Sequence, residues 1–203
     1  MIGVIELLND ISYADIDLVD SVRLYKSFNA LDKGLQLILR TQIFSNLKFT
    51  GWCAQYDPIS LSPVRGRSYE LESINPYVTT GIINYLMKIK NPGKEIIHSI
   101  QYAISWLKKS QINDFEIITN NNQLNNTDDA KIFSSKEQSY PLQIWARFYE
   151  IDSNLPIFSN RDGIVQYSYS KLSDERKINY EWYGKWPIHL ISSKYDKWLK
   201  SIN

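Results

Sequence analysis

Arginine is the residue type whose placement most clearly points to chemistry in this sequence. Only seven of its 23 basic side chains are arginine, so lysine serves wherever a plain positive charge suffices. Four of the seven lie in aromatic-rich segments that lack helical periodicity: Arg65, Arg67, Arg147 and Arg161. A guanidinium presents a planar fork that binds a carboxylate through two hydrogen bonds, which an ammonium cannot do. These arginines are therefore candidates for holding an anionic substrate.

Carboxylates near these arginines allow two other interpretations. Each arginine could pair with an acid and only hold a loop, with Glu70, Glu150 and Asp162 as the partners expected from the sequence. Alternatively, two carboxylates could act as the acid and base of a glycoside hydrolase, and Asp57 joins the same candidates for that role. Such hydrolysis depends on the distance between the two carboxylates, which sequence spacing does not give, so both interpretations stay open.

Other reactive side chains are scarce. Cys53 is the single cysteine, which excludes an intrachain disulfide and a cysteine-built zinc site. The two histidines, His98 and His189, are expected on helix surfaces, where neither is an obvious partner for a thiol nucleophile. Aromatic rings crowd the segment WYGKW at 182–186, where they could floor a sugar-binding cleft or simply fill a core.

Charge and hydropathy narrow the range of partners. Lys+Arg 23 against Asp+Glu 22 leaves a net charge of +1, which offers no broad basic field, and there is no glycine-rich phosphate loop or basic helix. We therefore expect no nucleic-acid partner. No apolar run approaches the roughly 18 residues of a membrane span, so we expect no membrane partner either.

Helices must position these side chains. Apolar residues recur at spacings of three and four over residues 20–42, 78–89 and 97–109, which predicts three amphipathic helices. Asn91 followed by Pro92 is expected to cap the third of them. Shorter helices are expected at three other places: residues 1–9, 171–177 and 187–200.

The remaining segments are expected to be loops with a few short strands. Residues 51–73 show no period and are interpreted as a structured loop, and the Asn-rich stretch 120–129 as a polar surface loop. Strands are expected at 115–119 and 145–151. Loosely paired helices separated by long loops favour an (α/α) toroid, so the expected fold is one mainly α, toroid-like helical domain.

The first residues indicate that this domain is incomplete. The segment MIGVIELL has the composition of a buried helix, with no capping residue before it and no turn to start it. It also lacks the basic region and the small-residue cleavage site of a signal peptide. We therefore expect a domain that is incomplete at its N-terminus, and the segment assigns no localisation.

Several long motifs along the chain resemble the family 10 pectate lyases. In chain order they are GVIELL at 3–8, LVD at 18–20, WCAQYD at 52–57, LSPVRGRSYE at 61–70, WARFYEI at 145–151, PIFSNRDG at 156–163 and ERKINYEWYGKWP at 175–187. The resemblance runs from Met1 to about Trp198. One departure is Tyr56, which stands where the family pattern has a histidine.

The resemblance implies an activity and a cofactor. Members of that family are longer, so residues 1–203 are expected to be the C-terminal portion of a pectate lyase-like catalytic domain. The implied reaction is calcium-assisted β-elimination in polygalacturonate, which yields an unsaturated uronide. Calcium is the implied cofactor, with ligands partly in an acidic segment that precedes Met1 in the family, and no ligand within this chain is assigned. Full-length members are secreted or periplasmic.

The resemblance also implies roles for individual residues. The family's base arginine falls on Arg67, and its two substrate-gripping arginines fall on Arg147 and Arg161. Arg65 and Tyr69, in the same motif as Arg67, are further substrate-binding candidates. Because arginine is protonated at any ordinary pH, Arg67 could act as a base only where other cations lower its pKa.

The expected partners are polygalacturonate and pectic oligosaccharides. An incomplete helix at Met1 would also favour self-association or a complementing N-terminal segment, and the isolated chain is expected to show little or no activity. Two rivals stay open, a protein that binds an acidic polysaccharide without cleaving it and a helical-toroid glycoside hydrolase acting on uronides. Elimination yields an ultraviolet-absorbing product, hydrolysis yields reducing ends without it, and binding alone yields neither.

Overall fold

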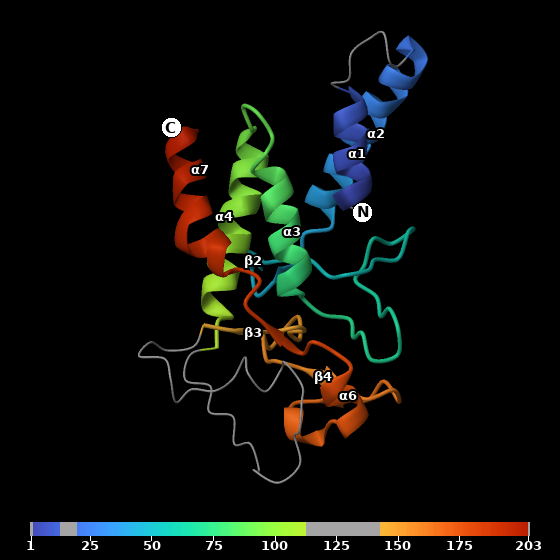
Figure 1. Ribbon diagram of the computed structural model, residues 1–203, viewed down its shortest axis with the longest axis vertical. Helices are drawn as coiled ribbons and strands as arrows, with labels where there is room; N and C mark the ends of the chain where they lie inside the picture. Colours follow the sequence, from blue (N-terminus) through green and yellow to red (C-terminus); the bar gives the residue numbers. More distant parts are fainter. Residues whose placement is uncertain (1, 13–19, 113–142, 203) are drawn as a thin grey trace.

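The computed structural model describes residues 2–12, 20–112 and 143–202 (Figure 1). About half of these residues are helical, so the expectation of a mainly α fold is confirmed. The α-helices are α1 (Ile2–Ser12), α2 (Ser21–Arg40), α3 (Pro76–Leu86), α4 (Lys94–Lys109), α6 (Asp174–Ile178) and α7 (Tyr195–Ser201). A 3-10 turn, η2 (Tyr169–Lys171), precedes α6, and a π-helical turn, η3 (Leu190–Lys194), precedes α7.

The described strands are two residues long and pair antiparallel. The pairs are β1 (Phe44–Ser45) with β2 (Lys48–Phe49), β3 (Trp145–Ala146) with β6 (Tyr183–Gly184), and β4 (Phe158–Ser159) with β5 (Val165–Gln166). The strand expected over 145–151 is shorter than predicted because the backbone then changes partner, and Tyr149 pairs with Ile74 and with Pro156. The strand expected at 115–119 and the loop at 120–129 lie outside the described residues.

Two neighbouring helices, α1 and α2, form one pair, and α3 and α4 form another (Figure 1). In the first pair the helices approach closely at Gly34, where a Cβ atom would lie 3.3 Å from Ile5 Cδ1. The hydroxyls of Ser12 and Ser27 are 2.8 Å apart across the same interface. Because α1 also contacts α3, the two pairs are joined.

The capping prediction for α4 is wrong. The helix begins only after Pro92, because Asn91 has a φ of 50°, in the left-handed region that a helix start does not use. An Asn–Pro start occurs at α3 instead. There Asn75 Oδ1 accepts a hydrogen bond from the backbone N–H of Val78 (3.2 Å), and Pro76 lies in the first turn.

Two hydrophobic clusters hold the fold together. The larger lies among α3, α4 and the segments packed on them, and Trp52 and Trp145 are fully buried in it. Both indole N–H groups donate to backbone carbonyls of helices at 2.8 Å, to Ile38 O and Leu107 O respectively, so burial leaves neither donor unpaired. The smaller cluster surrounds Phe148 at the end of the molecule that carries α6 (Figure 1).

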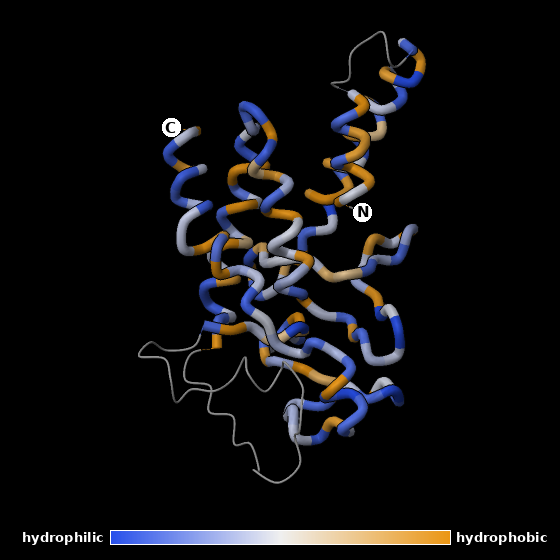
Figure 2. Tube along the Cα trace, viewed as in Figure 1, coloured by the Kyte–Doolittle hydropathy of each residue, from blue (hydrophilic) through white to orange (hydrophobic). Residues whose placement is uncertain are grey.

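The first helix pair leaves apolar side chains in solvent. Figure 2 shows hydrophobic residues along both of its helices. The exposed ones are Val4, Leu7, Val22, Tyr25, Phe28 and Leu37. The apolar stripe predicted for α2 is therefore covered only in part, with Ile38 fully buried but Phe28 48% exposed. No helix in the described ranges is both long and apolar enough to cross a membrane.

Candidate active site

Arg67 lies at a tight turn in the structured loop 51–73. The Gly66 N–H donates to Glu70 O (3.0 Å), and the Glu70 N–H donates to Arg67 O (2.8 Å). Glycine suits this turn because a Cβ at Gly66 would lie 2.8 Å from Glu70 Oε2. The Arg67 side chain is 65% exposed, with Nη2 2.6 Å from Glu70 Oε1 and Cζ 5.0 Å from the ring centre of Tyr69. The turn thus presents a guanidinium to solvent beside a tyrosine ring.

The ion pair with Glu70 affects the protonation of both partners. The hydrogen bond from Arg67 to Glu70 raises the pKa of Arg67 above its already high ordinary value. The same bond lowers the pKa of Glu70 below its usual range. A base needs the opposite shift, so proton removal by Arg67 requires that Glu70 first be displaced.

Arg147 lies in a cage of aromatic rings, and the pairing of β3 with β6 holds the backbone beside it. Its Cζ is 4.7 Å from the ring centre of Tyr77, 5.1 Å from that of Trp186 and 5.5 Å from that of Tyr180. Its Nη1 is 3.2 Å from Glu181 Oε2, and its Nε is buried without a hydrogen-bond partner among the described residues. The rings fix this side chain in place and leave one donor unused.

Arg161 lies in the turn that follows β4. The Asp162 carboxylate closes the turn by accepting a backbone hydrogen bond (2.9 Å), and Gly163 adopts a φ of 76° that favours glycine. Arg161 Nη2 is 2.8 Å from Glu175 Oε1 on α6. Hydrogen bonds from Arg176 and from Arg161 hold the pKa of Glu175 at about 2, so this carboxylate is ionised at any ordinary pH.

Arg65 joins the two loops that carry Arg67 and Arg161. An ideal Cβ at Gly163 would lie 2.5 Å from Arg65 Nη1 and 3.1 Å from Ser68 O. The two loops therefore pack directly against each other, and the absence of a side chain at Gly163 permits that approach.

A chain of contacts links Arg161 to Arg67. Both Arg161 and Arg176 donate to the carboxylate of Glu175. The guanidinium of Arg176 in turn lies over the ring of Tyr69, 4.4 Å from its centre. Because Arg67 lies over the same ring, the two exposed arginines are linked through one buried arginine and one buried tyrosine.

The same contacts continue to Arg147. The rings of Tyr69 and Tyr180 meet edge-on with their centres 5.1 Å apart, and the Tyr180 hydroxyl donates to Glu70 Oε1 at 3.3 Å. Arg147 lies over the ring of Tyr180. We call this set the arginine network, and its members are Arg67, Tyr69, Glu70, Arg147, Arg161, Glu175, Arg176, Tyr180 and Glu181. All five site residues expected from the sequence therefore belong to the network or adjoin it, and their individual roles stay predictions.

Comparison with known proteins decides the family. A family model described as pectic acid lyase matches residues 1–191. The chain belongs to the pectic acid lyase family. Two solved structures share its fold, the family 10 polysaccharide lyase from Cellvibrio cellulosa (TM-score 0.78) and an aspartate-to-alanine mutant of that lyase in complex with trigalacturonic acid (TM-score 0.80). Each is 23% identical and covers 96% of this chain, which spans only 58% and 60% of their respective lengths. No curated protein matches.

Ion pairing in this member of the family differs from that expected from the sequence. Three of the four arginines of the pair interpretation have an acidic partner, Arg67, Arg147 and Arg161, and of the acids considered only Glu70 is paired with an arginine in the described part of the chain. Glu150 accepts hydrogen bonds from Ser153 and from Tyr167 instead, and Asp162 closes its own turn. Arg147 and Arg161 pair with acids beyond residue 170, which lie close only after folding.

Three of the four carboxylates considered for hydrolysis, Asp57, Glu70 and Glu150, are poorly suited to act as a general acid. Asp57 accepts the backbone N–H of Ser60 (2.7 Å), and Glu150 accepts the hydroxyl of Ser153. These hydrogen bonds lower the pKa of Asp57 and of Glu150, and that of Glu70 is lowered as well. A glycosidase acid needs a raised pKa, so the arrangement disfavours hydrolysis.

The residues that the structure describes do not fit a calcium site by themselves. Calcium takes about six to eight oxygen ligands, several of them from carboxylates. Among the described residues, no group of three or more His, Cys, Asp or Glu side chains could hold a metal ion. The acids of the network, Glu70, Glu175 and Glu181, are each paired with a guanidinium.

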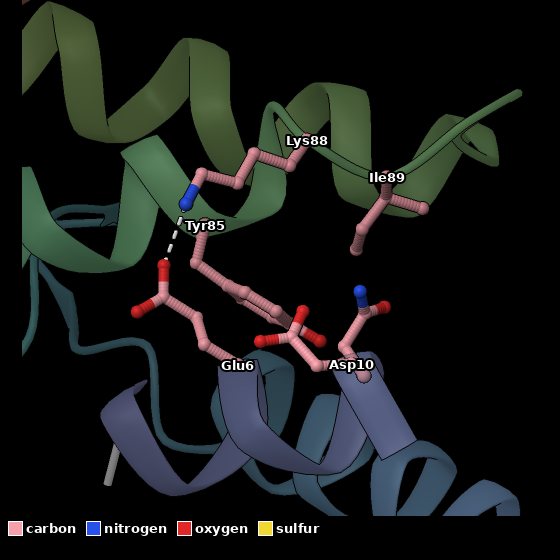
Figure 3. Close-up of a pocket in the computed structure, with 6 residues that line it drawn as sticks. Glu6, Asp10, Tyr85, Lys88 and Ile89 are labelled. Carbon is pink, nitrogen blue, oxygen red and sulfur yellow. Dashed lines mark hydrogen bonds and ion pairs between the residues drawn. The ribbon is translucent and has the colours of Figure 1, made fainter. Parts of the chain in front are cut away.

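A pocket of about 330 Å³ lies apart from the network, beside α1 and the end of α3 (Figure 3). Its lining residues are Glu6, Asn9, Asp10, Tyr85, Lys88 and Ile89. Across it the Lys88 ammonium is 2.6 Å from Glu6 Oε1. None of these residues belongs to the arginine network, so the pocket has no part in the candidate site.

Four members of the network were not expected from the sequence as functional residues: Glu175, Arg176, Tyr180 and Glu181. All lie in the segment 175–181, ERKINYE, which belongs to one of the motifs that resemble the family. The signal that could have found them is the mixture of charges and a ring within one motif.

Proposed function

We propose that this chain binds polygalacturonate at the arginine network and that the substrate is cleaved there by β-elimination. The main support is the network itself, in which arginines distant in sequence join one cluster of guanidinium groups and rings. Polygalacturonate carries one carboxylate per sugar, and a guanidinium fork matches each of them. Membership of the pectic acid lyase family favours the same substrate, as does the trigalacturonic acid in the similar solved structure.

Arg147 and Arg161 would bind uronate carboxylates. Their present partners, Glu181 and Glu175, are about half exposed. Exposed ion pairs are worth only about 0–1 kcal/mol, so a substrate carboxylate can replace the protein carboxylate at little cost. Tyr77, half exposed beside Arg147, offers a ring face to the sugar.

Arg67 would remove the proton at C5 of the bound galacturonate. The electron pair of that C–H bond forms the C4=C5 double bond, the C4–O bond breaks, and the departing oxygen takes up a proton. Glu70 must first leave Arg67, because their ion pair raises the pKa of Arg67. Nearby cations favour the neutral guanidine, and Arg176, which shares the Tyr69 ring, is one of them.

Two finer parts of the proposal concern calcium and the whole fold. No step above depends on calcium, and its involvement is to be tested by adding and removing it. The pairing of α1 with α2 and of α3 with α4 supports an (α/α) toroid, in which such pairs repeat. Because the chain spans about three fifths of the similar solved structures, we also propose that it is slow or inactive by itself.

The test follows three signals from the chain mixed with polygalacturonate, with and without calcium. These are ultraviolet absorbance of an unsaturated product, new reducing ends, and binding of trigalacturonate by calorimetry. We expect binding, and any absorbance should disappear in Arg67→Lys. The matched control is Arg23→Lys, since Arg23 is also exposed and ion-paired, with Asp20 at 2.8 Å, but lies on α2.

Each other outcome points elsewhere. Reducing ends without absorbance would favour a glycoside hydrolase. Binding without cleavage, even after a complementary portion of a related lyase is added, would favour a binding protein. Absence of trigalacturonate binding would contradict the proposed function.

A further inference from the structure

Arg176 is the one buried arginine of the arginine network. It lies on the short helix α6, and its side chain is only 4% exposed, so it cannot itself bind a polysaccharide. Burying a guanidinium is costly unless the charge is paired. The contacts that compensate for this cost show what the side chain does in the fold.

The first of these contacts is a bidentate ion pair with Glu175. Arg176 Nε donates to Glu175 Oε2 at 2.7 Å, and Nη2 donates to Oε1. Glu175 Oε1 also accepts Nη2 of the exposed Arg161 at 2.8 Å. Arg176 therefore fixes the orientation of the carboxylate on which Arg161 rests.

The second contact is with Tyr69. The guanidinium of Arg176 lies 4.4 Å from the centre of this ring, and that of Arg67 lies 5.0 Å from the same centre. Tyr69 is buried, and its ring also packs edge-on against Tyr180. Arg176 thereby holds the ring against which Arg67 is placed.

The backbone of Arg176 is fixed as well. Its carbonyl accepts the indole N–H of the buried Trp182 at 2.8 Å, and Ser173 caps the helix one turn earlier. Its Nη1 is buried without a hydrogen-bond partner in the described part of the chain. A site selected for stability alone would favour an apolar side chain here, because an unpaired buried donor destabilises the fold.

We propose that Arg176 is a positioning residue of the arginine network, which orients Arg161 through Glu175 and Arg67 through the ring of Tyr69. Lysine cannot replace it, because an ammonium offers neither the planar fork nor the flat face that lies over the ring. The proposal rests on the proposed function for its consequence in substrate binding. The positioning itself is a property of the unliganded chain.

The test compares the unchanged chain with Arg176→Lys, Arg161→Gln and the double variant. Lys177→Gln is the matched control, because Lys177 lies on the same helix but pairs with Asp174 at 3.6 Å. Thermal melting establishes that each variant is folded. Should Arg176→Lys fail to fold, Glu175→Gln breaks the same link from its half-exposed side.

We expect Arg176→Lys and Arg161→Gln each to weaken trigalacturonate binding about tenfold, with Lys177→Gln near the unchanged value. The double variant should lose less than the product of the two single effects, because Arg176 acts partly through Arg161. By carboxyl NMR, Arg176→Lys should also raise the pKa of Glu175. Binding by Arg176→Lys within about twofold of the unchanged chain, or fully multiplicative losses with no change in that pKa, would overturn the proposal.

Failure of the unchanged chain to bind trigalacturonate would count against the proposed function and leave the positioning to NMR alone. In that event the order of the Arg161 side chain and the pKa of Glu175 decide. If Arg176→Lys changes both the order of the Arg161 side chain and the pKa of Glu175, positioning is supported. If neither changes, positioning is refuted.

Discussion

At the scale of single residues, the proposed function makes Glu70 a competitor of the substrate carboxylate for Arg67. The Glu70 carboxylate holds Arg67 Nη2 at 2.6 Å and also accepts the hydroxyl of Tyr180. Removing this competitor frees an exposed guanidinium for an anion. We expect Glu70→Gln to bind trigalacturonate up to about fivefold more tightly, since an exposed ion pair is worth about 0–1 kcal/mol.

The control for this prediction is Glu72→Gln. Glu72 is an exposed acid of the same segment and lies outside the arginine network. Glu72→Gln loses the same charge as Glu70→Gln. Titrating both variants with trigalacturonate by calorimetry therefore separates local competition at Arg67 from a general electrostatic effect. Equal tightening in Glu70→Gln and Glu72→Gln would contradict a specific competition at Arg67.

Glu175 should make the stability of the fold depend on pH in the acidic range. Its pKa is about 2 in the folded chain against an ordinary 4.5, because Arg176 and Arg161 donate to it. Its ion pairs therefore stabilise the fold fully above about pH 4.5, and this contribution is lost as the pH falls towards 2. The free energy of unfolding, measured in denaturant at several pH values, should fall less steeply below pH 4.5 in Glu175→Gln than in the unchanged chain.

The neighbouring acid supplies the comparison. Asp174 is 93% exposed and pairs only with Lys177 at 3.6 Å among the contacts described above. Asp174→Asn should therefore keep most of the acid dependence of the unchanged chain. If the slope of unfolding free energy against pH changes equally in Asp174→Asn and Glu175→Gln, the arginine network is not the source of the pH dependence.

At the scale of elements, the start of α3 depends on one side chain. Asn75 Oδ1 accepts the Val78 N–H at 3.2 Å, and the helix that follows carries much of the larger cluster. Replacing an Asn cap by Ala typically costs about 1 kcal/mol. We expect Asn75→Ala to lower the free energy of unfolding by about that amount in urea titrations.

The second Asn–Pro pair provides the contrast. Asn91 has a φ of 50° and caps no helix, so Asn91→Gly should leave stability within about 0.5 kcal/mol. A similar decrease in the free energy of unfolding in Asn75→Ala and Asn91→Gly would contradict a specific stabilisation by the cap.

The elements that were predictable are those with a period. Spacings of three and four located α2, α3 and α4 to within a few residues, because each carries its apolar residues along one face. Two-residue strands such as β3 have no period, so their pairing could not be predicted. Capping was misassigned because Asn–Pro indicates only a local preference, whereas Asn91 adopts a φ of 50° and α4 begins after Gly93.

The candidate site was predictable by residue type but not by partner. Arginine in loops marked Arg67, Arg147 and Arg161, and folding brings all of them into one network. Their actual partners come from segments 14 and 34 positions away in two of the three cases, and sequence proximity carries no information about such contacts. Arg176 escaped notice because burial, which gives it its meaning, is a property of the tertiary structure.

At the scale of the whole molecule, the outer face of α1 and α2 exposes several apolar side chains to solvent. Val22 and Tyr25 are 59% and 69% exposed on α2, and Val4 and Leu7 are exposed on α1. Exposed apolar clusters of this kind favour association with another surface. The chain also spans only about three fifths of the similar solved structures.

We therefore expect the purified chain to self-associate through this face. Sedimentation velocity over a range of concentrations should show a shift from monomer to larger species, and the double variant Val22→Lys with Tyr25→Lys should remain monomeric because charge opposes burial of the face. Ile59→Lys is the matched control, since Ile59 is 92% exposed and lies in the loop of Arg67, outside the sequence of both helices. Association that persists in the double variant, or is abolished equally by Ile59→Lys, would place the contact elsewhere. A chain that stays monomeric at every concentration would show that the exposed apolar side chains of α1 and α2 are tolerated in water.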